Sequence, residues 1–114
     1  HWQLGPVITE LAEHPETRQA IIELHDRGID QDRMGTRRIP CSMYYQLMRR
    51  DGKLDMIYTM RSVDLVNHLA NDVWMATAIR DIIAEQLSIP PGKFILFAGS
   101  LHTYRKDFEK LTNY

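Results

Sequence analysis

The chain has 114 residues and a formal net charge of −1, with 44% hydrophobic and 25% charged residues. This length fits a single globular domain of ordinary composition, and the balanced charge argues against a nucleic acid polymer as partner. No apolar run approaches the roughly 20 residues that a membrane-spanning helix needs. Because the single cysteine, Cys41, cannot form an internal disulfide, we expect a reducing, cytoplasmic compartment.

The first part of the chain predicts one helix and one strand. Apolar residues at helical spacing favour a short amphipathic helix over residues 3–13. Pro15 ends it, because a proline pushes the residue before it out of the helical region. The β-branched stretch 18–25 predicts a strand. The polar, glycine-containing stretch 26–38 predicts an irregular loop.

The middle of the chain predicts a β-hairpin. Residues 42–49 and 53–61 are two strand-like runs rich in Tyr, Met, Leu and Ile. Between them, Asp51 and Gly52 can adopt the positive φ that a tight turn requires.

A long helix is predicted next. Apolar residues recur every three or four positions from Leu65 to Leu87, with Asp64 in the position of its N-cap. The Pro-Pro-Gly run at 90–92 ends the helix, residues 93–97 form an apolar strand, and the charged tail is helical. The fold class is therefore α+β, with a mostly antiparallel sheet packed on one long central helix.

Ordered motifs along the chain resemble those of thymidylate synthases. Residues 38–46 (Arg-Ile-Pro-Cys-Ser-Met-Tyr-Tyr-Gln) are similar to the family's nucleophile segment, in which a Pro-Cys pair precedes a strand that ends in glutamine. Residues 60–64 resemble its Arg-Ser-x-Asp segment, 97–104 its Gly-x-x-His-x-Tyr segment, and 14–19 the turn that leads to a phosphate-binding arginine. The resemblance implies a thymidylate-synthase-like fold.

The same resemblance implies one catalytic core over residues 1–114. The chain starts at His1 rather than Met, and further functional segments of the family lie upstream and downstream of the matching motifs. We therefore expect an excerpt that lacks N- and C-terminal parts.

The resemblance implies roles for the residues around the cysteine. Cys41 is the nucleophile that attacks carbon 6 of a pyrimidine, since a thiolate adds readily and is easily expelled. Arg61 would favour the thiolate and hold the nucleotide phosphate through two parallel hydrogen bonds, and Ser62 would add a hydroxyl to that phosphate. Arg18 would reach the phosphate of a neighbouring subunit, which implies a homodimer with shared active sites.

Other motif residues complete the implied site. His102 and Tyr104 lie one residue apart on an extended segment, so both can contact the ribose hydroxyl. Asp64 would order the folate co-substrate, 5,10-methylenetetrahydrofolate, and Gln46 would assist substrate binding. The resemblance implies no metal.

The base-selecting residue departs from the usual synthase. The family's asparagine, 11 residues after the motif arginine, pairs with uracil; here that position is Asp72. An ionised carboxylate only accepts hydrogen bonds, which suits the exocyclic amine of cytosine. Asn71 is the alternative selector, if the alignment slips by one residue.

Three functional hypotheses follow. The first is a hydroxymethyltransferase acting on a cytidine monophosphate (dCMP or CMP), the second a thymidylate synthase converting dUMP to dTMP, and the third an inactive remnant. Further departures, namely Gln19, Ser42, His68, Ala70 and Ser100, are typical of phage-encoded relatives that act in the host cytoplasm.

Overall fold

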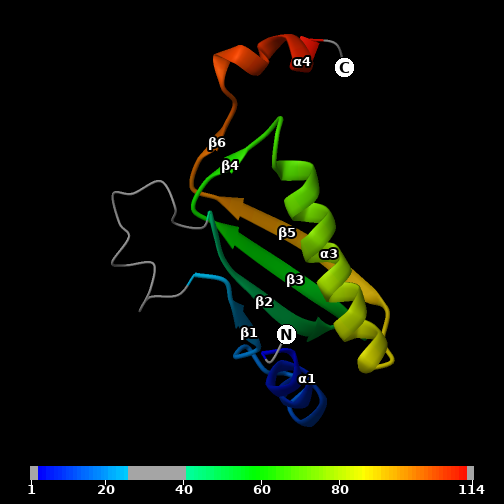
Figure 1. Cartoon of the computed structure of the whole chain (residues 1–114). Helices are drawn as coiled ribbons and strands as arrows, with labels where there is room; N and C mark the ends of the chain where they lie inside the picture. Colours follow the sequence, from blue (N-terminus) through cyan, green and yellow to red (C-terminus); the bar gives the residue numbers. More distant parts are fainter. Residues whose placement is uncertain (1–2, 26–40, 113–114) are drawn as a thin grey trace.

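The computed structural model describes residues 3–25 and 41–112 (Figure 1). The loop predicted over residues 26–38 lies outside the described residues. The elements in chain order are α1 (Leu4–Glu13), β1 (Ile21–Glu23), β2 (Ser42–Arg50), β3 (Lys53–Met60), β4 (Val63–Asp64), α3 (Leu69–Gln86), β5 (Pro91–Ala98), β6 (Leu101–His102), the 3₁₀ turn η2 (Arg105–Asp107) and α4 (Phe108–Thr112).

A four-stranded sheet in the order β1-β2-β3-β5 forms the body of the structure. The pairs β1–β2 and β2–β3 are antiparallel, and β5 joins β3 in parallel after the chain has crossed through α3. The predicted hairpin is confirmed: Asp51 and Gly52 form the turn between β2 and β3, with φ of 54° and 73°. A glycine at the second position is favoured because it adopts this φ without a Cβ clash.

One face of the sheet carries the core. Alternate residues of β3, from Leu54 to Met60, are buried, as the period of two in a strand requires. They pack with the buried residues of α3 and α1, and Figure 1 shows both helices on the same side of the sheet. The predicted α+β class, with a mostly antiparallel sheet on a long helix, is confirmed.

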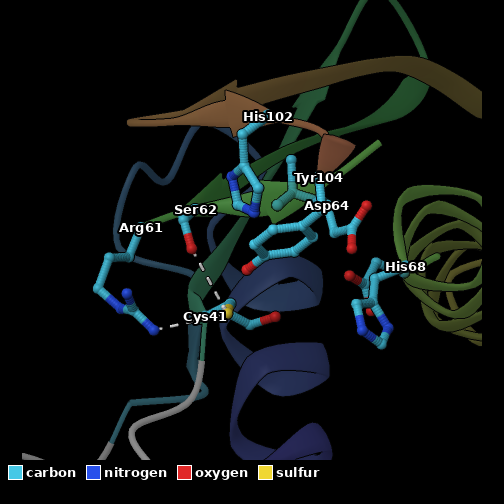
Figure 2. Close-up of a pocket in the computed structure, with 10 residues that line it drawn as sticks. Cys41, Arg61, Ser62, Asp64, His68, His102 and Tyr104 are labelled. Atoms are coloured by element: carbon cyan, nitrogen blue, oxygen red, sulfur yellow. Dashed lines mark hydrogen bonds between the residues drawn. The ribbon is translucent and has the colours of Figure 1, made fainter. Parts of the chain in front are cut away.

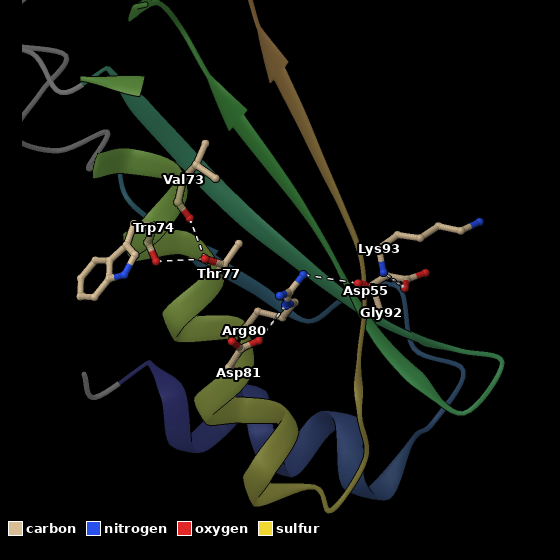
Figure 3. Close-up of polar contacts among 8 residues, drawn as sticks. All are labelled: Asp55, Val73, Trp74, Thr77, Arg80, Asp81, Gly92 and Lys93. Atoms are coloured by element: carbon tan, nitrogen blue, oxygen red, sulfur yellow. Dashed lines mark hydrogen bonds and ion pairs between the residues drawn. The ribbon is translucent and has the colours of Figure 1, made fainter. Parts of the chain in front are cut away.

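Polar contacts join β5 to the start of β3 and α3 to the start of β5. The backbone N–H of Lys93 donates to Asp55 Oδ1 at 2.7 Å, and Arg80 Nη1 donates to the carbonyl of Gly92 at 3.3 Å (Figure 3). Charged side chains thus fix the positions of α3 and β5 at the end of the sheet where β3 and β5 begin. The elements β4 and β6 follow at the other end, where β3 and β5 finish.

Two sequence predictions about element ends are wrong. The long helix begins at Leu69 rather than Leu65, and His68, not Asp64, is its N-cap. Asp64 instead ends β4, and its Oδ1 accepts the backbone N–H groups of Val66 and Asn67, which forms a turn ahead of the helix. The strand predicted over residues 18–25 is limited to Ile21–Glu23.

The strands β3 and β5 bend together into a second, two-stranded sheet. The N–H of Gly99 donates to the carbonyl of Met60 at 3.0 Å, that of Ser100 to Arg61 at 3.1 Å, and β4 then pairs in parallel with β6. A Cβ on Gly99 would lie 2.7 Å from the Arg61 carbonyl oxygen, so only glycine allows this approach. Residues 61–64 and 99–102 are thereby placed side by side.

Among the residues that the structure describes, none of the helices has the length and apolar character of a membrane span.

Candidate active site

A pocket of about 470 Å³ opens where the bent strands meet the start of α3 (Figure 2). It collects residues from the start of β2, the bend after β3, the start of α3 and the segment around β6. Its lining residues are Cys41, Ser42, Arg61, Ser62, Val63, Asp64, His68, Asp72, His102 and Tyr104. Sequence segments far apart in the chain thus form one concave surface.

Cys41 lies at the centre of this surface with two donors directed at its sulfur (Figure 2). Arg61 Nη2 lies 3.5 Å from Sγ and Ser62 Oγ lies 3.6 Å from it. The antiparallel pairing of β2 with β3 causes this arrangement, because the Arg61 N–H donates to the Cys41 carbonyl at 2.7 Å. The thiol is exposed, with a guanidinium and a hydroxyl beside its sulfur.

Asp64 forms a buried, hydrogen-bonded wall of the pocket. Its carboxylate accepts bonds from the N–H groups of Val66 and Asn67, and from Asn67 Nδ2 at 2.8 Å. The Asn67 side chain, more than the backbone bonds, lowers the pKa of Asp64 below its usual value, against the opposing effect of burial. Asp64 is therefore an ionised hydrogen-bond acceptor at neutral pH.

His102 and Tyr104 lie beside Asp64, because His102 is the partner of Asp64 in the pairing of β4 with β6 (Figure 2). Their rings are 5.3 Å apart in an edge-to-face arrangement, and the Ser100 hydroxyl lies 3.3 Å from His102 Nδ1. Both side chains line the pocket, and Tyr104 is 54% exposed. The tyrosine is therefore accessible to a molecule in the pocket.

The start of α3 contributes two residues one helical turn apart. Asp72 donates its backbone N–H to the carbonyl of His68, and residues at this spacing project from the same face of a helix. Both line the pocket, whereas Asn71 is exposed and is not among the lining residues. Burial raises the pKa of Asp72, and the nearby His68 partly opposes this.

Ser42, which lines the pocket, is hydrogen-bonded to one of two buried tyrosines that lie outside the lining. Ser42 Oγ and the Tyr58 hydroxyl form a short hydrogen bond, and the Tyr45 ring packs edge-on against Tyr58 at 4.8 Å. Burial, followed by the proximity of Tyr58 and Asp72, raises the pKa of Tyr45 to about 12, and burial also raises the pKa of Tyr58. Both tyrosines therefore remain protonated at neutral pH.

Two predicted site residues lie outside the pocket. Arg18 is exposed beside a separate shallow depression near Glu10 and Thr17, and Gln46 Nε2 donates to the Arg18 carbonyl at 3.0 Å. The structure therefore brings Cys41, Arg61, Ser62, Asp64, Asp72, His102 and Tyr104 together, but places neither Arg18 nor Gln46 with them. Their predicted roles stay predictions.

One titratable lining residue, His68, was not among the site residues predicted from the sequence. His68 was recognised only as a departure from the family pattern, yet it lines the pocket beside Asp72. Its spacing of four residues from Asp72 would have indicated a shared helix face.

Within the two described ranges, no group of three or more His, Cys, Asp and Glu side chains is arranged to hold a metal ion.

Comparison with known proteins gives a consistent result. The family model described as thymidylate synthase matches residues 2–114. A thymidylate synthase of Rhodopseudomonas palustris (strain BisA53) is 30% identical over 104 residues, which cover 90% of this chain and 34% of the relative. A deoxyuridylate hydroxymethyltransferase of Bacillus phage SP01 is 28% identical over 107 residues, which cover 93% of this chain and 28% of the relative. The chain thus spans about a third of the length of these relatives.

Proposed function

This chain belongs to the thymidylate synthase family, and on that premise we propose that the protein carrying it transfers a one-carbon unit to carbon 5 of a pyrimidine nucleoside monophosphate. The observation that carries this proposal is the position of Cys41 Sγ in the pocket, within 3.5 Å of the Arg61 guanidinium and 3.6 Å of the Ser62 hydroxyl. These groups form a nucleophile beside an anion-binding pair, which fits a phosphorylated substrate.

In the proposed reaction the Cys41 sulfur forms a bond to carbon 6 of the base. The electron pair of the 5,6 double bond moves toward carbon 5, which then forms a bond to the one-carbon unit as one of that unit's two bonds to the donor nitrogens breaks. The proton on carbon 5 leaves as the second carbon–nitrogen bond breaks, so that tetrahydrofolate would be the leaving group. Hydride or water then adds to the transferred carbon, and the sulfur is expelled as thiolate when the 5,6 double bond forms again. Arg61 and Ser62 stabilise the thiolate at both ends of this sequence, and His102 and Tyr104 hold the sugar.

The folate co-substrate, 5,10-methylenetetrahydrofolate, would supply the one-carbon unit when bound. Asp64 fits a folate ring, whose N–H groups need acceptors. An ionised carboxylate has about four lone-pair positions, and the hydrogen bonds from Val66 N–H, Asn67 N–H and Asn67 Nδ2 occupy part of that capacity. The carboxylate can therefore accept a further bond from the pocket side.

Asp72 supports cytosine as the base. Burial raises the pKa of Asp72, but in its ionised form the carboxylate accepts a hydrogen bond from the exocyclic amine of cytosine. Against uracil, the same carboxylate would face O4, which is also an acceptor. An unsatisfied buried polar group costs about 1–3 kcal/mol. The product would then be the 5-hydroxymethyl derivative of dCMP or CMP, formed when water rather than hydride completes the transfer.

A second candidate acts on dUMP, and one observation favours it. Because burial raises the pKa of Asp72, a protonated carboxyl can donate to O4 of uracil while its other oxygen accepts from N3–H. The names of both relatives fit this base, since one is a thymidylate synthase and the other a deoxyuridylate hydroxymethyltransferase. Hydride transfer would then give dTMP, and water addition would give the hydroxymethyl product.

We also propose a homodimer with shared sites in the cytoplasm. The sheet face opposite the helices presents Ile21, Ile95 and Phe97, which are 42%, 41% and 59% exposed. The strand registers place Ile21, Gln46, Ile57 and Ile95 in one row across this face, in which three of the four side chains are apolar. A second copy covering the face would bury these side chains, and Arg18 would then be free to reach the partner's phosphate site.

The single cysteine of this chain is consistent with a reducing compartment.

The test follows hydrogen at carbon 5. The natural protein carrying this chain, in its full reading frame, is given 5,10-methylenetetrahydrofolate with dCMP or dUMP labelled with tritium at carbon 5. Tritium release from dCMP, lost in Cys41→Ser and shifted toward dUMP in Asp72→Asn, would support the first candidate. Release from dUMP alone would support the second.

A third outcome identifies an inactive remnant. In that case neither nucleotide releases tritium, a 5-fluoropyrimidine nucleotide forms no covalent adduct, and Cys41→Ser leaves nucleotide binding unchanged.

A further inference from the structure

An amide outside the family motifs joins two buried carboxylates at the edge of the pocket. Asn67 Nδ2 donates to Asp64 Oδ2 at 2.8 Å and to Asp107 Oδ2 at 2.9 Å. Asp64 is 6% exposed and Asp107 is 3% exposed, and these are the buried charged residues of the described chain. The two carboxylates lie 43 positions apart in the sequence, one before α3 and one in η2.

The chemistry of this bridge fixes the orientation of Asn67. An ionised carboxylate only accepts, whereas a side-chain amide group carries two N–H donors. One hydrogen for each carboxylate satisfies both, and the reversed amide would direct its oxygen at two acceptors. The Asn67 side chain is also the largest cause that lowers the pKa of Asp64 and of Asp107. Without it, two buried like charges would share the site with fewer donors.

Asp107 connects this bridge to the segment that follows Tyr104. Its backbone N–H donates to the Tyr104 carbonyl at 2.9 Å, and Lys110 of α4 lies 3.3 Å from its Oδ1. Figure 1 shows η2 and α4 beyond β6, away from the body of the sheet. The Asn67–Asp107 bond therefore ties that segment to the turn before α3, and both ends of the bond adjoin residues that line the pocket.

We propose that Asn67 and Asp107 are positioning residues, which hold the Asp64 carboxylate in the orientation from which it accepts a hydrogen bond from the folate co-substrate. The part of this inference that concerns folate rests on the proposed function. Asp107 orients the amide, the amide orients Asp64, and only Asp64 faces the ligand. The bridge thereby lets the segment after Tyr104 influence the folate side of the pocket and not its phosphate side.

The kinetic test compares Asn67→Ala and Asp107→Ala with the parent, in the natural full-length protein. Since a small displacement of a positioned group can cost up to about 100-fold, we expect KM for methylenetetrahydrofolate to rise by about tenfold. The dissociation constant of the nucleotide should change less than about twofold. Asp107→Asn should restore the folate KM, because its amide oxygen can still accept from Asn67.

Lys110→Ala and Asn71→Ala are the matched controls. The first removes the exposed ion pair of Asp107 and leaves the bridge, and the second truncates an exposed asparagine at the start of α3. Neither should change the folate KM. Equal KM values in parent, Asn67→Ala and Asp107→Ala would overturn the proposal. If Asn67→Ala does not fold, the difference between Asp107→Ala and Asp107→Asn decides the question.

A second readout does not depend on activity. Aspartate labelled with ¹³C at the carboxyl carbon is titrated by NMR, and the Asp64 signal is the one missing from Asp64→Asn. In Asn67→Ala the pKa of Asp64 should rise toward its usual value, and in Lys110→Ala it should stay low. If the parent releases no tritium from either nucleotide, the proposed function fails while this titration still tests the bridge. An unchanged Asp64 titration in Asn67→Ala would refute the bridge itself.

Discussion

At the scale of single residues, some of the side chains in and around the pocket could be predicted from the sequence and others could not. Cys41, Arg61, Ser62 and Asp72 fall in motifs or at fixed distances from them, and the structure places them on one surface. His68 lay outside those motifs, and only the helical spacing from Asp72 indicates it. The Asn67–Asp107 bond joins residues 40 positions apart, and no local pattern predicts such a pair.

Asp72 gives a prediction about stability at this scale. Its pKa is raised by burial, so its ionised form destabilises the folded state. The penalty is absent below the ordinary carboxyl pKa, where the folded and unfolded states are both protonated, and is complete above the raised folded pKa. We therefore expect Asp72→Asn to raise Tm by a few degrees at pH 7 and to have almost no effect near pH 3.

Thermal unfolding between pH 3 and pH 8 measures this difference. The matched control is Asn71→Asp, which adds a carboxylate at the exposed neighbouring position and should not lower Tm comparably. A parent that is as stable as Asp72→Asn at pH 7 would mean that Asp72 is well solvated or paired in the folded protein. The preference for cytosine or uracil, measured on the same variants, then shows whether the destabilising carboxylate of Asp72 is needed to select the base.

At the scale of elements, periodicity predicted the existence of helices and strands better than their ends. The hydrophobic repeat of α3 continues backward through Leu65, so the pattern alone could not show that the helix begins at Leu69. The decisive contacts are bonds from the backbone N–H groups of Val66 and Asn67 to the Asp64 side chain, which form a turn. The β2–β3 hairpin was predicted well because its turn chemistry is local.

The bend between β5 and β6 gives a prediction about an element. Gly99 approaches the Arg61 carbonyl so closely that an added Cβ would lie 2.7 Å from it. Gly99→Ala should therefore push the two bends apart, with a cost of about 1–3 kcal/mol in the free energy of unfolding, as for an overpacked core. It should also displace Arg61 from its contact with the Cys41 sulfur and thereby change the rate at which Cys41 is alkylated in the folded protein.

Denaturant unfolding and mass spectrometry of the alkylated thiol measure these two effects. Gly5→Ala is the matched control, because a Cβ at Gly5 meets no atom within 4 Å. If Gly99→Ala matched the parent in both measurements, the bends would have room to separate without moving Arg61.

At the scale of the whole molecule, the sheet has one face covered by helices and one that carries exposed apolar residues. A sheet face of this kind is typical of an interface, and the predicted position of Arg18 in a shared site requires one. The sequence could suggest the second copy only through family resemblance, since the mostly apolar row across the sheet depends on strand registers.

Shared sites predict complementation between inactive variants. Arg18→Ala and Cys41→Ser should each be inactive as homodimers. In a mixed dimer both defects fall in one site and the other site is intact, so mixing after reversible dissociation should restore activity to about a quarter of the parent's. The activity of the mixture, with dimer formation followed by analytical ultracentrifugation, measures this.

Phe97→Asp, on the exposed sheet face, serves as the control that prevents dimer formation and should abolish the recovery. A mixture that stays inactive although mixed dimers form would mean that Arg18 does not serve the partner's site.

The parallel pairing of β3 with β5 has a consequence for the order in which this molecule folds. The β1–β2–β3 part uses antiparallel neighbours, and its hairpin closes through a two-residue turn, whereas β5 reaches β3 only after the whole of α3 has been laid down. Contacts that close longer loops form later, and a two-residue, partly exposed strand such as β6 opens more readily than a long buried ladder. Cys41 and Arg61 face each other within the early hairpin, but His102 and Tyr104 arrive only with β6. The proposed nucleophile is thus set in place before the residues proposed to hold the sugar, and amide hydrogens around β6 should exchange with solvent faster than those of the β2–β3 ladder.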